Sequence, residues 1–164
     1  MPLSVYHFLK PLVLIQDLKT KEAVQLLTNN YIGHLAFLVG KRPFCVPITF
    51  FYDKDNNTII SYAIQGHKIK AMRQNPEVCL AISDIDSVSS WRSVMVHGTF
   101  EELKSIDAKY YLHEFSEGVK GVIRRKEKDH LKFINEFSAK LESVGIPVIY
   151  RIVLDDMTAK FRKE

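Results

Sequence analysis

The sequence predicts a mainly β protein, a small six-stranded antiparallel barrel with α-helical additions. Six short segments rich in β-branched and aromatic residues are separated by turn signals, which is typical of strands joined as hairpins. These segments do not alternate with long helical patterns, and this argues against a parallel α/β fold. The 164 residues are enough for one domain with a substantial core. We therefore expect a single barrel domain over residues 1–164.

The first part of the chain predicts one helix and three strands. Residues 20–29 carry apolar side chains at helical spacing and end at two asparagines. Strands follow over 33–39 and 43–52, and the short glycine turn between them indicates a hairpin. The sequence DKDNN at 53–57 is a strong turn signal. It leads into a third strand at 58–62.

The middle of the chain predicts a short helix and two further strands. The helix begins at position 66 or 67 and ends at 73, because Asn75-Pro76 follows and a proline disfavours a helical residue before it. Residues 78–83 form the fourth strand. A polar loop over 84–90 then leads into a long fifth strand at 91–102.

The last third of the chain has a different pattern. Residues 106–115 and 128–143 have the spacing of amphipathic helices. The basic stretch 118–128 is expected to link them, so the helical insertion spans about 105–143. The sixth strand covers 148–154.

Composition limits the classes of function. Apolar residues make up 46% of the chain and charged residues 26%, which is ordinary for a globular protein. No apolar run approaches the roughly 20 residues that span a bilayer, and the start has no basic n-region or signal cleavage pattern. We therefore expect a cytoplasmic protein with no membrane partner, in which Cys45 and Cys79 are reduced, buried thiols.

The formal charge of +4 is mild, and the basic residues cluster at 124–128 and 160–163. Aromatic residues do not interleave with these clusters in a nucleic-acid-binding motif. Solvated surface is therefore the favoured interpretation, and we expect no nucleic-acid partner.

Standard catalytic and metal-binding motifs are missing from the sequence. The six histidines form no H-E-x-x-H pattern and do not pair with cysteines at the spacing of metal ligands. The sequence also has no G-x-S-x-G, no Walker A motif and no G-x-G-x-x-G. This excludes most hydrolase, NTPase and Rossmann interpretations. It leaves no residue predicted to be catalytic or to bind a metal.

Residues 58–72 pass from a strand into a helix through Gly66, His67 and Lys68. A helix start leaves unpaired backbone N–H groups, and the helix dipole favours an anion there. Lys68 adds a positive charge close to a glycine that lets a ligand approach the backbone. One interpretation is a phosphate site. The other, favoured on this stretch alone, is an ordinary connection with two exposed basic residues.

Pro47 marks a second candidate region. Proline cannot donate a hydrogen bond to a sheet, so Pro47 belongs at a sheet edge or a bulge. At an open barrel edge, backbone groups of Val46, Ile48 and Thr49 would be free to contact a ligand. An ordinary bulge is an equal alternative.

Trp91, Arg92 and Ser93 form a third candidate region at the entrance to the fifth strand. The indole can stack on a planar ring, the guanidinium can pair with a phosphate, and the hydroxyl can donate to either. A half-buried tryptophan beside a surface arginine is the commoner arrangement.

Six short motifs also occur in a fixed order between about residues 15 and 160. They are Ile32-Gly33-His34-Leu35-Ala36; Arg42-Pro43 with Val46-Pro47-Ile48-Thr49-Phe50; Ile60 to Lys68; Asn75-Pro76 with Val78-Cys79; Trp91-Arg92-Ser93-Val94 with Gly98; and Thr158-Ala159-Lys160. In this order they resemble the flavin-binding split-barrel family of pyridoxamine 5′-phosphate oxidase-like proteins, and within it the nitroimidazole-resistance branch.

The resemblance implies a split barrel that binds FMN, with FAD as the alternative, in a cleft between the two subunits of a homodimer. Four groups of residues would contact the flavin, some of them from the partner chain. They are Val46, Pro47, Ile48 and Thr49 along the ring; Ser61 and Tyr62 along the ribityl and phosphate side; His67 and Lys68 at the phosphate; and Trp91, Arg92 and Ser93 at the flavin.

The implied activity is an oxidoreductase that moves electrons between a reduced donor and a small organic substrate. A flavin-binding or storage module without catalysis, or a haem-handling split-barrel relative, are the alternatives. Ser61 stands where members of the resistance branch often carry a histidine, and Ala159 replaces a glycine of the family's T-G-K motif. The helical insertion is also longer than the resemblance leads us to expect.

Overall fold

The structure, a computed structural model, describes residues 14–127 and 147–163, which form an antiparallel sheet with three helices packed on it. The strand order is β3-β2-β6-β7-β8-β5-β4, and β1 pairs with β8. In chain order the elements are β1 (Gln16–Asp17), α1 (Thr20–Thr28), β2 (Ile32–Val39), β3 (Arg42–Thr49), β4 (Phe51–Asp53), β5 (Thr58–Ile64), α2 (His67–Gln74), β6 (Glu77–Ser87), β7 (Ser90–Glu102), α3 (Ser105–Lys126) and β8 (Pro147–Arg162). The predicted fold class is confirmed, with eight strands in place of six.

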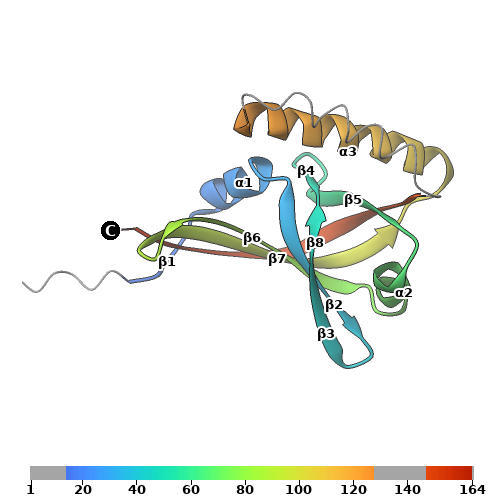
Figure 1. The fold of residues 1–164 in the computed structure, drawn as a ribbon, viewed down its shortest axis with the longest axis horizontal. Helices are drawn as coiled ribbons and strands as arrows, with labels where there is room; N and C mark the ends of the chain where they lie inside the picture. Colours follow the sequence, from blue (N-terminus) through green and yellow to red (C-terminus); the bar gives the residue numbers. More distant parts are fainter. Residues whose placement is uncertain (1–13, 128–146, 164) are drawn as a thin grey trace, which may run out of the picture.

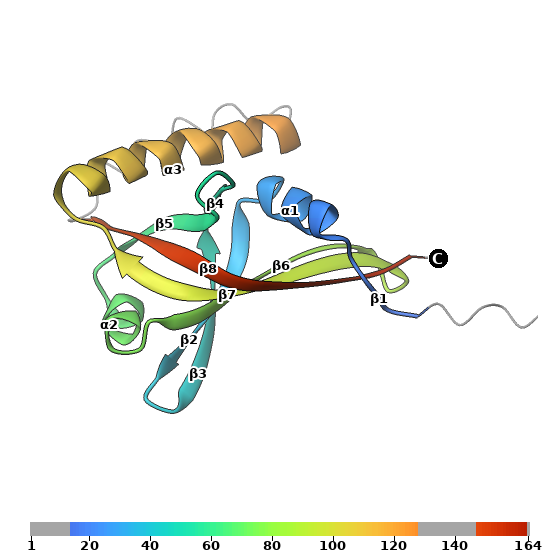
Figure 2. The ribbon, with the colours of Figure 1, turned by 180° about the vertical axis from the view of Figure 1, so that it is seen from behind.

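The sheet extends at one end into a narrow arm, made by residues 83–93, residues 160–162 and β1 (Figure 1). α1 and α3 lie on one side of the sheet, and α3 packs on β4, β5 and β8. α2 lies at the end of the molecule away from the arm, next to β2 (Figures 1 and 2). Among the described residues, no helix has both the length and the apolar character needed to cross a membrane.

The chain from 42 to 53 closes the sheet on itself. The sequence predicts one strand here, but the structure breaks it at Phe50 into β3, which pairs with β2, and β4, which pairs with β5. The backbone N–H of Phe50 donates to the carbonyl of Tyr31 at 2.8 Å, and the Phe50 side chain is fully buried. Phe50 is therefore the corner at which the strand passes from one edge of the sheet to the other. Because β3 and β5 contact each other without a ladder between them, the barrel is split along this line.

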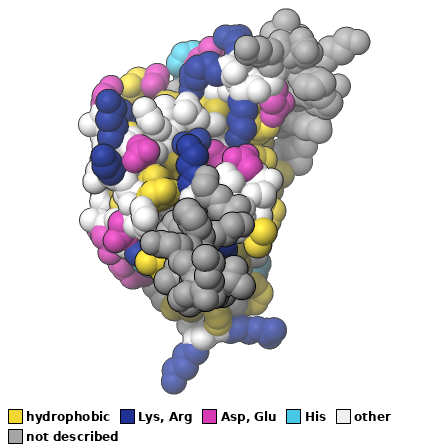
Figure 3. All heavy atoms as spheres, turned by 90° about the vertical axis from the view of Figure 1, so that its left-hand side faces the viewer, with side chains coloured by type: hydrophobic (Ala, Val, Ile, Leu, Met, Phe, Trp, Pro, Cys, Tyr) yellow, Lys and Arg dark blue, Asp and Glu magenta, His cyan; other side chains and the backbone are white. Residues whose placement is uncertain are grey.

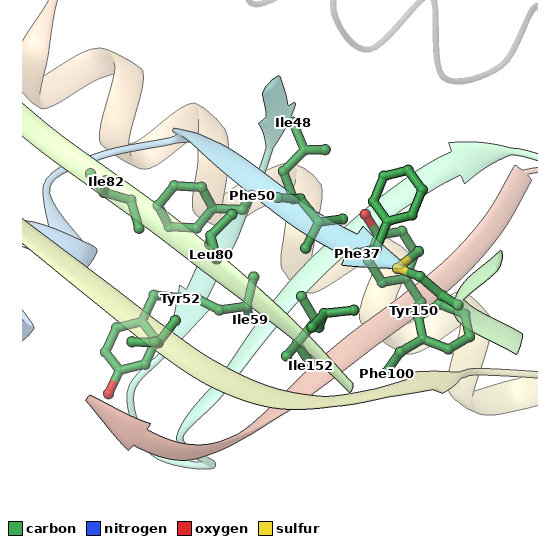
Figure 4. Close-up of a cluster of buried hydrophobic side chains, with 14 of the residues drawn as sticks. Phe37, Ile48, Phe50, Tyr52, Ile59, Leu80, Ile82, Phe100, Tyr150 and Ile152 are labelled. Atoms are coloured by element: carbon green, nitrogen blue, oxygen red, sulfur yellow. The ribbon is translucent and has the colours of Figure 1, made fainter. Parts of the chain in front are cut away.

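Alternating side chains of the strands point into one hydrophobic core (Figure 4). In β2, for example, Leu35 and Phe37 are buried whereas His34 is exposed, which is the period of two that a strand imposes. The rings of Phe100 and Tyr150 lie 5.3 Å apart, centroid to centroid, in the same core. This packing fixes β8, and through it β5, against the centre of the sheet.

α3 corrects the prediction of a helix that ends at residue 115. It continues to Lys126, through most of the predicted linker 118–128, because Phe115, Val119 and Ile123 form one continuous buried stripe. The glycines of this stretch do not end the helix. The second predicted helix, 128–143, lies outside the described residues.

Gly118 lets α3 approach the sheet, since a Cβ at this position would lie 2.3–2.5 Å from three ring carbons of Phe51. We expect Gly118→Ala to lower the free energy of unfolding by about 1 kcal/mol, because a steric cost of about 1–3 kcal/mol outweighs a gain in helix propensity of about 1 kcal/mol. Thermal denaturation followed by circular dichroism measures the change. In the matched control Gly121→Ala, the added Cβ would meet only Arg125 Nη1 at 3.6 Å, so that variant should be slightly stabilised. Equal shifts in the two variants would contradict the prediction.

Two strands are longer than predicted. β6 continues to Ser87 through most of the predicted loop 84–90, because its polar residues pair with β7 to build the arm. β8 continues to Arg162, past a bulge opposite His97 and Gly98, whereas the sequence places its end at 154. Ala159 lies within β8 and pairs with Val94, so a tight turn is not needed there. The strong turn signal at 53–57 is confirmed, because the backbone N–H groups of Asp55 and Asn56 donate to the carboxylate of Asp53.

Candidate functional site

The split between β3 and β5, which we call the seam, is formed by residues 44–49 on one side and 61–68 on the other. At one end, the Ser61 hydroxyl donates to the carbonyl oxygen of Thr49 at 2.7 Å. At the other end, the rings of Phe44 and His67 meet edge to face with centroids 5.4 Å apart. The fold thus brings together two of the three regions singled out in the sequence, around Pro47 and around Lys68.

The seam edge of β3 has no ladder partner among the described residues, since the pairs of β3 are all with β2. Pro43 and Pro47 lack an N–H, and a strand tolerates proline where the backbone points away from its neighbour. Thr49 has the same parity, and its carbonyl does point across to β5. The alternation of an antiparallel pair therefore directs the N–H groups of Cys45 and Thr49 toward the seam. By the same alternation, the backbone groups of Val46 and Ile48 bond to β2.

The start of α2 is an uncapped helix N-terminus. Gly66 is its N-cap residue, no side chain caps the helix, and its first turn contains no acidic residue. The first helical hydrogen bond runs from the N–H of Lys70 to the carbonyl of Gly66 at 3.0 Å. The three N–H groups that precede it have no helical acceptor, and the helix dipole adds a partial positive charge. This end of the helix is suited to bind an anion.

Lys68 strengthens this suitability. Its side chain is half-buried, and the burial lowers the pKa of its ammonium group. Within the described residues no carboxylate forms an ion pair with it, whereas Lys120 and Lys160 have acidic partners. A partly desolvated charge without a counter-ion is unfavourable, and an anion bound at the start of α2 would relieve that cost. His67, next to it, is exposed.

Ser61 and Tyr62, predicted along the ribityl and phosphate side of a flavin, point their side chains into the protein. Ser61 is 1% exposed and bonded to Thr49. The Tyr62 ring packs edge to face on Phe115 of α3, 5.4 Å between centroids, and burial raises the pKa of its hydroxyl. The Ser61 hydroxyl bridges the seam to Thr49 and the Tyr62 ring points toward α3, so neither side chain extends toward a ligand.

Trp91, Arg92 and Ser93 lie in the arm, at the opposite end of the molecule from α2 (Figures 1 and 2). They also do not face the same way, because alternate residues of a strand point to opposite faces. The guanidinium of Arg92 binds Asp84 at 3.1 Å. Within one chain, the structure therefore does not bring these three residues to the seam.

Three cavities lie away from the seam. The largest, about 360 Å³, lies between α1, α3 and the arm, and Asp84 and Arg92 are among its lining residues. Lys and Arg side chains gather, with acidic ones among them, on the face of the molecule at the arm end (Figure 3). A second cavity, of about 270 Å³, includes Trp91 and Arg162. The third, of about 230 Å³, includes Cys79 and His97 on the outer face of the sheet.

The sequence gives no signal for one polar pair beside the third cavity. His97 Nδ1 lies 2.8 Å from Asp156 Oδ1, although 58 residues separate them, because they face each other across β7 and β8. Cys79 is the partner of His97 on β6. It is only partly buried and Cys45 is exposed, so the prediction that both thiols are buried is wrong. Burial, together with the neighbouring thiol of Cys45, raises the pKa of Cys79, which makes it a poor nucleophile. The described residues contain no group of His, Cys, Asp and Glu that could hold a metal ion.

The family model described as pyridoxamine 5′-phosphate oxidase matches residues 19–161.

The chain belongs to the pyridoxamine 5′-phosphate oxidase family. The resemblance noted in the sequence is thereby confirmed. An uncharacterized protein of Rhizobium meliloti is 28% identical to this family member, over 89% of this chain and 94% of that protein.

Solved structures agree with this assignment at the level of the fold. An FAD-binding protein from Mesorhizobium loti superposes with a TM-score of 0.69 at 24% identity, covering 92% of this chain and 99% of that one. A candidate 5-nitroimidazole antibiotic resistance protein from Bacteroides thetaiotaomicron has a TM-score of 0.61 at 16% identity, covering 90% and 88%. An FAD-binding protein from Mycobacterium smegmatis has a TM-score of 0.59 at 17% identity, covering 92% and 100%. The family and the split-barrel fold are therefore settled together.

Proposed function

We propose that this family member binds a flavin along the seam, with the phosphate at the start of α2 and the ring beside the Pro47 edge of β3. The observation that carries the proposal is Lys68, a half-buried cation with no acidic partner among the described residues, placed at an uncapped helix N-terminus. A phosphate there would accept from backbone N–H groups and pair with the ammonium group.

The β3 edge suits the ring end of the same ligand. The side chain of Pro47 offers an apolar surface, and the N–H groups of Cys45 and Thr49 offer donors for the oxygen and nitrogen acceptors of an isoalloxazine ring. When bound, a flavin supplies hydride or single-electron transfer, which the side chains of the seam cannot supply themselves. The protein's own contribution is to bind and orient it.

FMN is the flavin that best fits the anion site formed by Lys68 and the start of α2. Its terminal phosphate monoester is a dianion, which matches one ammonium group together with three uncapped N–H groups. FAD is the alternative, because two structural neighbours are described as FAD-binding. Mass spectrometry of the cofactor released from purified protein distinguishes the two.

We further propose that two chains form a homodimer in which the arm of one chain covers the seam of the other. The support is the position of Trp91 and Ser93 in the first residues of β7, which belong to the arm, because the arm lies at the far end of the chain from α2 (Figures 1 and 2). A partner chain would supply them to the flavin, as the family resemblance implies. Arg92 differs from them, because Asp84 already neutralises it in part.

The activity that follows is an FMN-dependent oxidoreductase acting on a small organic substrate. Absorbance of the purified protein tests the flavin directly: a yellow protein with a flavin spectrum is expected, and a colourless protein that does not take up added FMN would contradict it. NAD(P)H oxidation with a nitroaromatic acceptor tests the electron transfer.

A flavin-binding or storage module without catalysis is the second candidate. One observation favours it: the Ser61 side chain is buried, and its hydroxyl donates to the carbonyl of Thr49. The position where the resistance branch often has a histidine therefore offers no acid or base. A flavin-loaded protein with no turnover on any donor and acceptor pair would support this candidate over the first.

Ser93→Ala tests the contribution of the arm. We expect it to weaken FMN binding by about 1 kcal/mol, or roughly fivefold, which is the range for one hydrogen bond between uncharged groups. Fluorescence quenching of FMN on titration measures the dissociation constant. Ser83→Ala, which removes a hydroxyl from the direct cross-strand partner of Ser93, is the control and should bind normally. An effect of Ser93→Ala larger than that of Lys68→Met would reverse the proposed order of importance.

A further inference from the structure

The split of the barrel is held at one end by a single side chain. Ser61 is 1% exposed, and its hydroxyl donates to the Thr49 carbonyl at 2.7 Å. β3 and β5 share no ladder in the part of the chain that the structure describes, so a side chain here makes the connection that a backbone ladder makes between the other neighbouring strands.

The two bonded residues differ in how firmly they are held. Ser61 lies in β5, which pairs with β8 along its whole length and places Ser61 opposite Tyr150. Thr49 is the last residue of β3, an edge strand, and it precedes the corner at Phe50. Ser61 is therefore the fixed member of the pair, and the position of Thr49 at the seam depends on it.

The bond also changes what Thr49 offers to a ligand. A carbonyl at the seam edge would be an acceptor, and it would repel the two carbonyl oxygens on the pyrimidine side of a flavin. The Ser61 hydroxyl engages one of the two lone pairs of this carbonyl and offsets part of that repulsion, so the N–H of Thr49 is the backbone group that this residue presents to an acceptor. The edge is then matched to an acceptor-rich ring.

We propose that Ser61 is a positioning residue that locks the seam at Thr49 and thereby sets the donor edge against which the flavin ring binds. The inference rests on the proposed function, because it takes the seam as the flavin site. It gives Ser61 a role different from contact with the ribityl chain.

Tyr150 provides a matched control in the same core. Tyr150 lies opposite Ser61 in the register, and its hydroxyl is fully buried and interacts with the Ser61 hydroxyl, not with Thr49. Burial raises the pKa of this hydroxyl to about 12, so it stays neutral. Tyr150→Phe removes a buried hydroxyl beside Ser61 without touching Thr49, and it should leave flavin binding unchanged.

The test compares two ligands, FMN and riboflavin, which lacks the phosphate. Ser61→Ala should weaken both by about tenfold, leave the ratio of their affinities unchanged and shift the absorption maximum of the bound flavin. Lys68→Met should instead weaken FMN and leave riboflavin near its wild-type value. Tyr150→Phe should keep both dissociation constants within about twofold of wild type. Where Ser61→Ala does not fold, Ser61→Cys, with its weaker donor, should change binding in the same direction.

Several outcomes would overturn the inference. Ser61→Ala that loses thermal stability but keeps both affinities and the flavin spectrum would show a purely structural bond. Equal losses in Ser61→Ala and Tyr150→Phe would show a general effect on the core. A wild-type protein that binds neither ligand would overturn the proposed function itself, and that result is distinct from the other two.

Discussion

Lys68→Met should weaken FMN binding by roughly 10- to 150-fold, or about 1.5–3 kcal/mol, the range for hydrogen bonds that involve a charged group. The substitution removes the ammonium group and keeps an unbranched side chain of similar length, so the start of α2 remains intact. Isothermal titration with FMN measures the loss. Unchanged affinity would mean that Lys68 does not meet the phosphate.

The same substitution should leave the ligand-free protein as stable as wild type or more stable. Burial lowers the folded-state pKa of Lys68 below its ordinary value of 10.5, so folding disfavours the charged form at neutral pH. This destabilising effect is fully present below the lowered pKa and disappears as pH rises through the window up to 10.5. The stability advantage of Lys68→Met should therefore be largest at neutral pH and shrink under alkaline conditions.

Lys70→Met is the control for both effects. Lys70 lies on the same short helix and carries the same charge, but its side chain is exposed. Its loss should change FMN affinity only through the weak, salt-screened field of a surface charge. If Lys70→Met weakened FMN binding as much as Lys68→Met, the helix would attract the phosphate only through its overall positive charge. No specific lysine would then bind the phosphate at the start of α2.

The parts of the fold that could be predicted from sequence are those set by local patterns. The strand periodicity of Leu35 and Phe37, the turn at 53–57 and the proline stop at Pro76 each depend on neighbouring residues, and the structure has all three features. The full length of α3 could not be predicted in this way. From the sequence, Gly118 indicates the end of a helix. In the structure it lies within the helix, because the ring of Phe51, which is distant in the chain, packs where a side chain at position 118 would lie.

The features of the candidate site also differ in whether local sequence or tertiary structure determines them. The approach of Pro47 to Lys68 follows from motif order only through the family resemblance, because closure of the barrel is a tertiary event. One difference could have been found from sequence: strand alternation alone places Trp91 and Ser93 on one face and Arg92 on the other. The inward direction of Ser61 and the pairing of His97 with Asp156 depend on register, which the sequence does not specify.

Gly98→Ala should destabilise the fold more than any other glycine substitution considered above. An added Cβ would lie 2.3 Å from the carbonyl oxygen of Val153 and 2.8 Å from Cγ2 of Ile152, both on β8. The oxygen belongs to the backbone, so only a separation of β7 from β8 could relieve the clash. We expect a loss of about 2–3 kcal/mol, the upper part of the range for overpacking, and a fall in melting temperature of roughly 5–10 °C.

Gly33→Ala is the informative comparison for Gly98, because Gly33 is also a buried glycine within a strand. Its Cβ would meet Leu80 Cδ1 at 2.9 Å, the end of a flexible side chain that can rotate away. The smaller loss expected there isolates the cost of a backbone clash, and equal losses would contradict this explanation. Gly98 also adjoins the bulge at which β8 gains an extra residue opposite β7. Bulges bend a strand and increase its twist. In the proposed homodimer, a substitution at Gly98 that moves β8 should therefore also weaken flavin binding, because it would displace Trp91 and Ser93 in the arm.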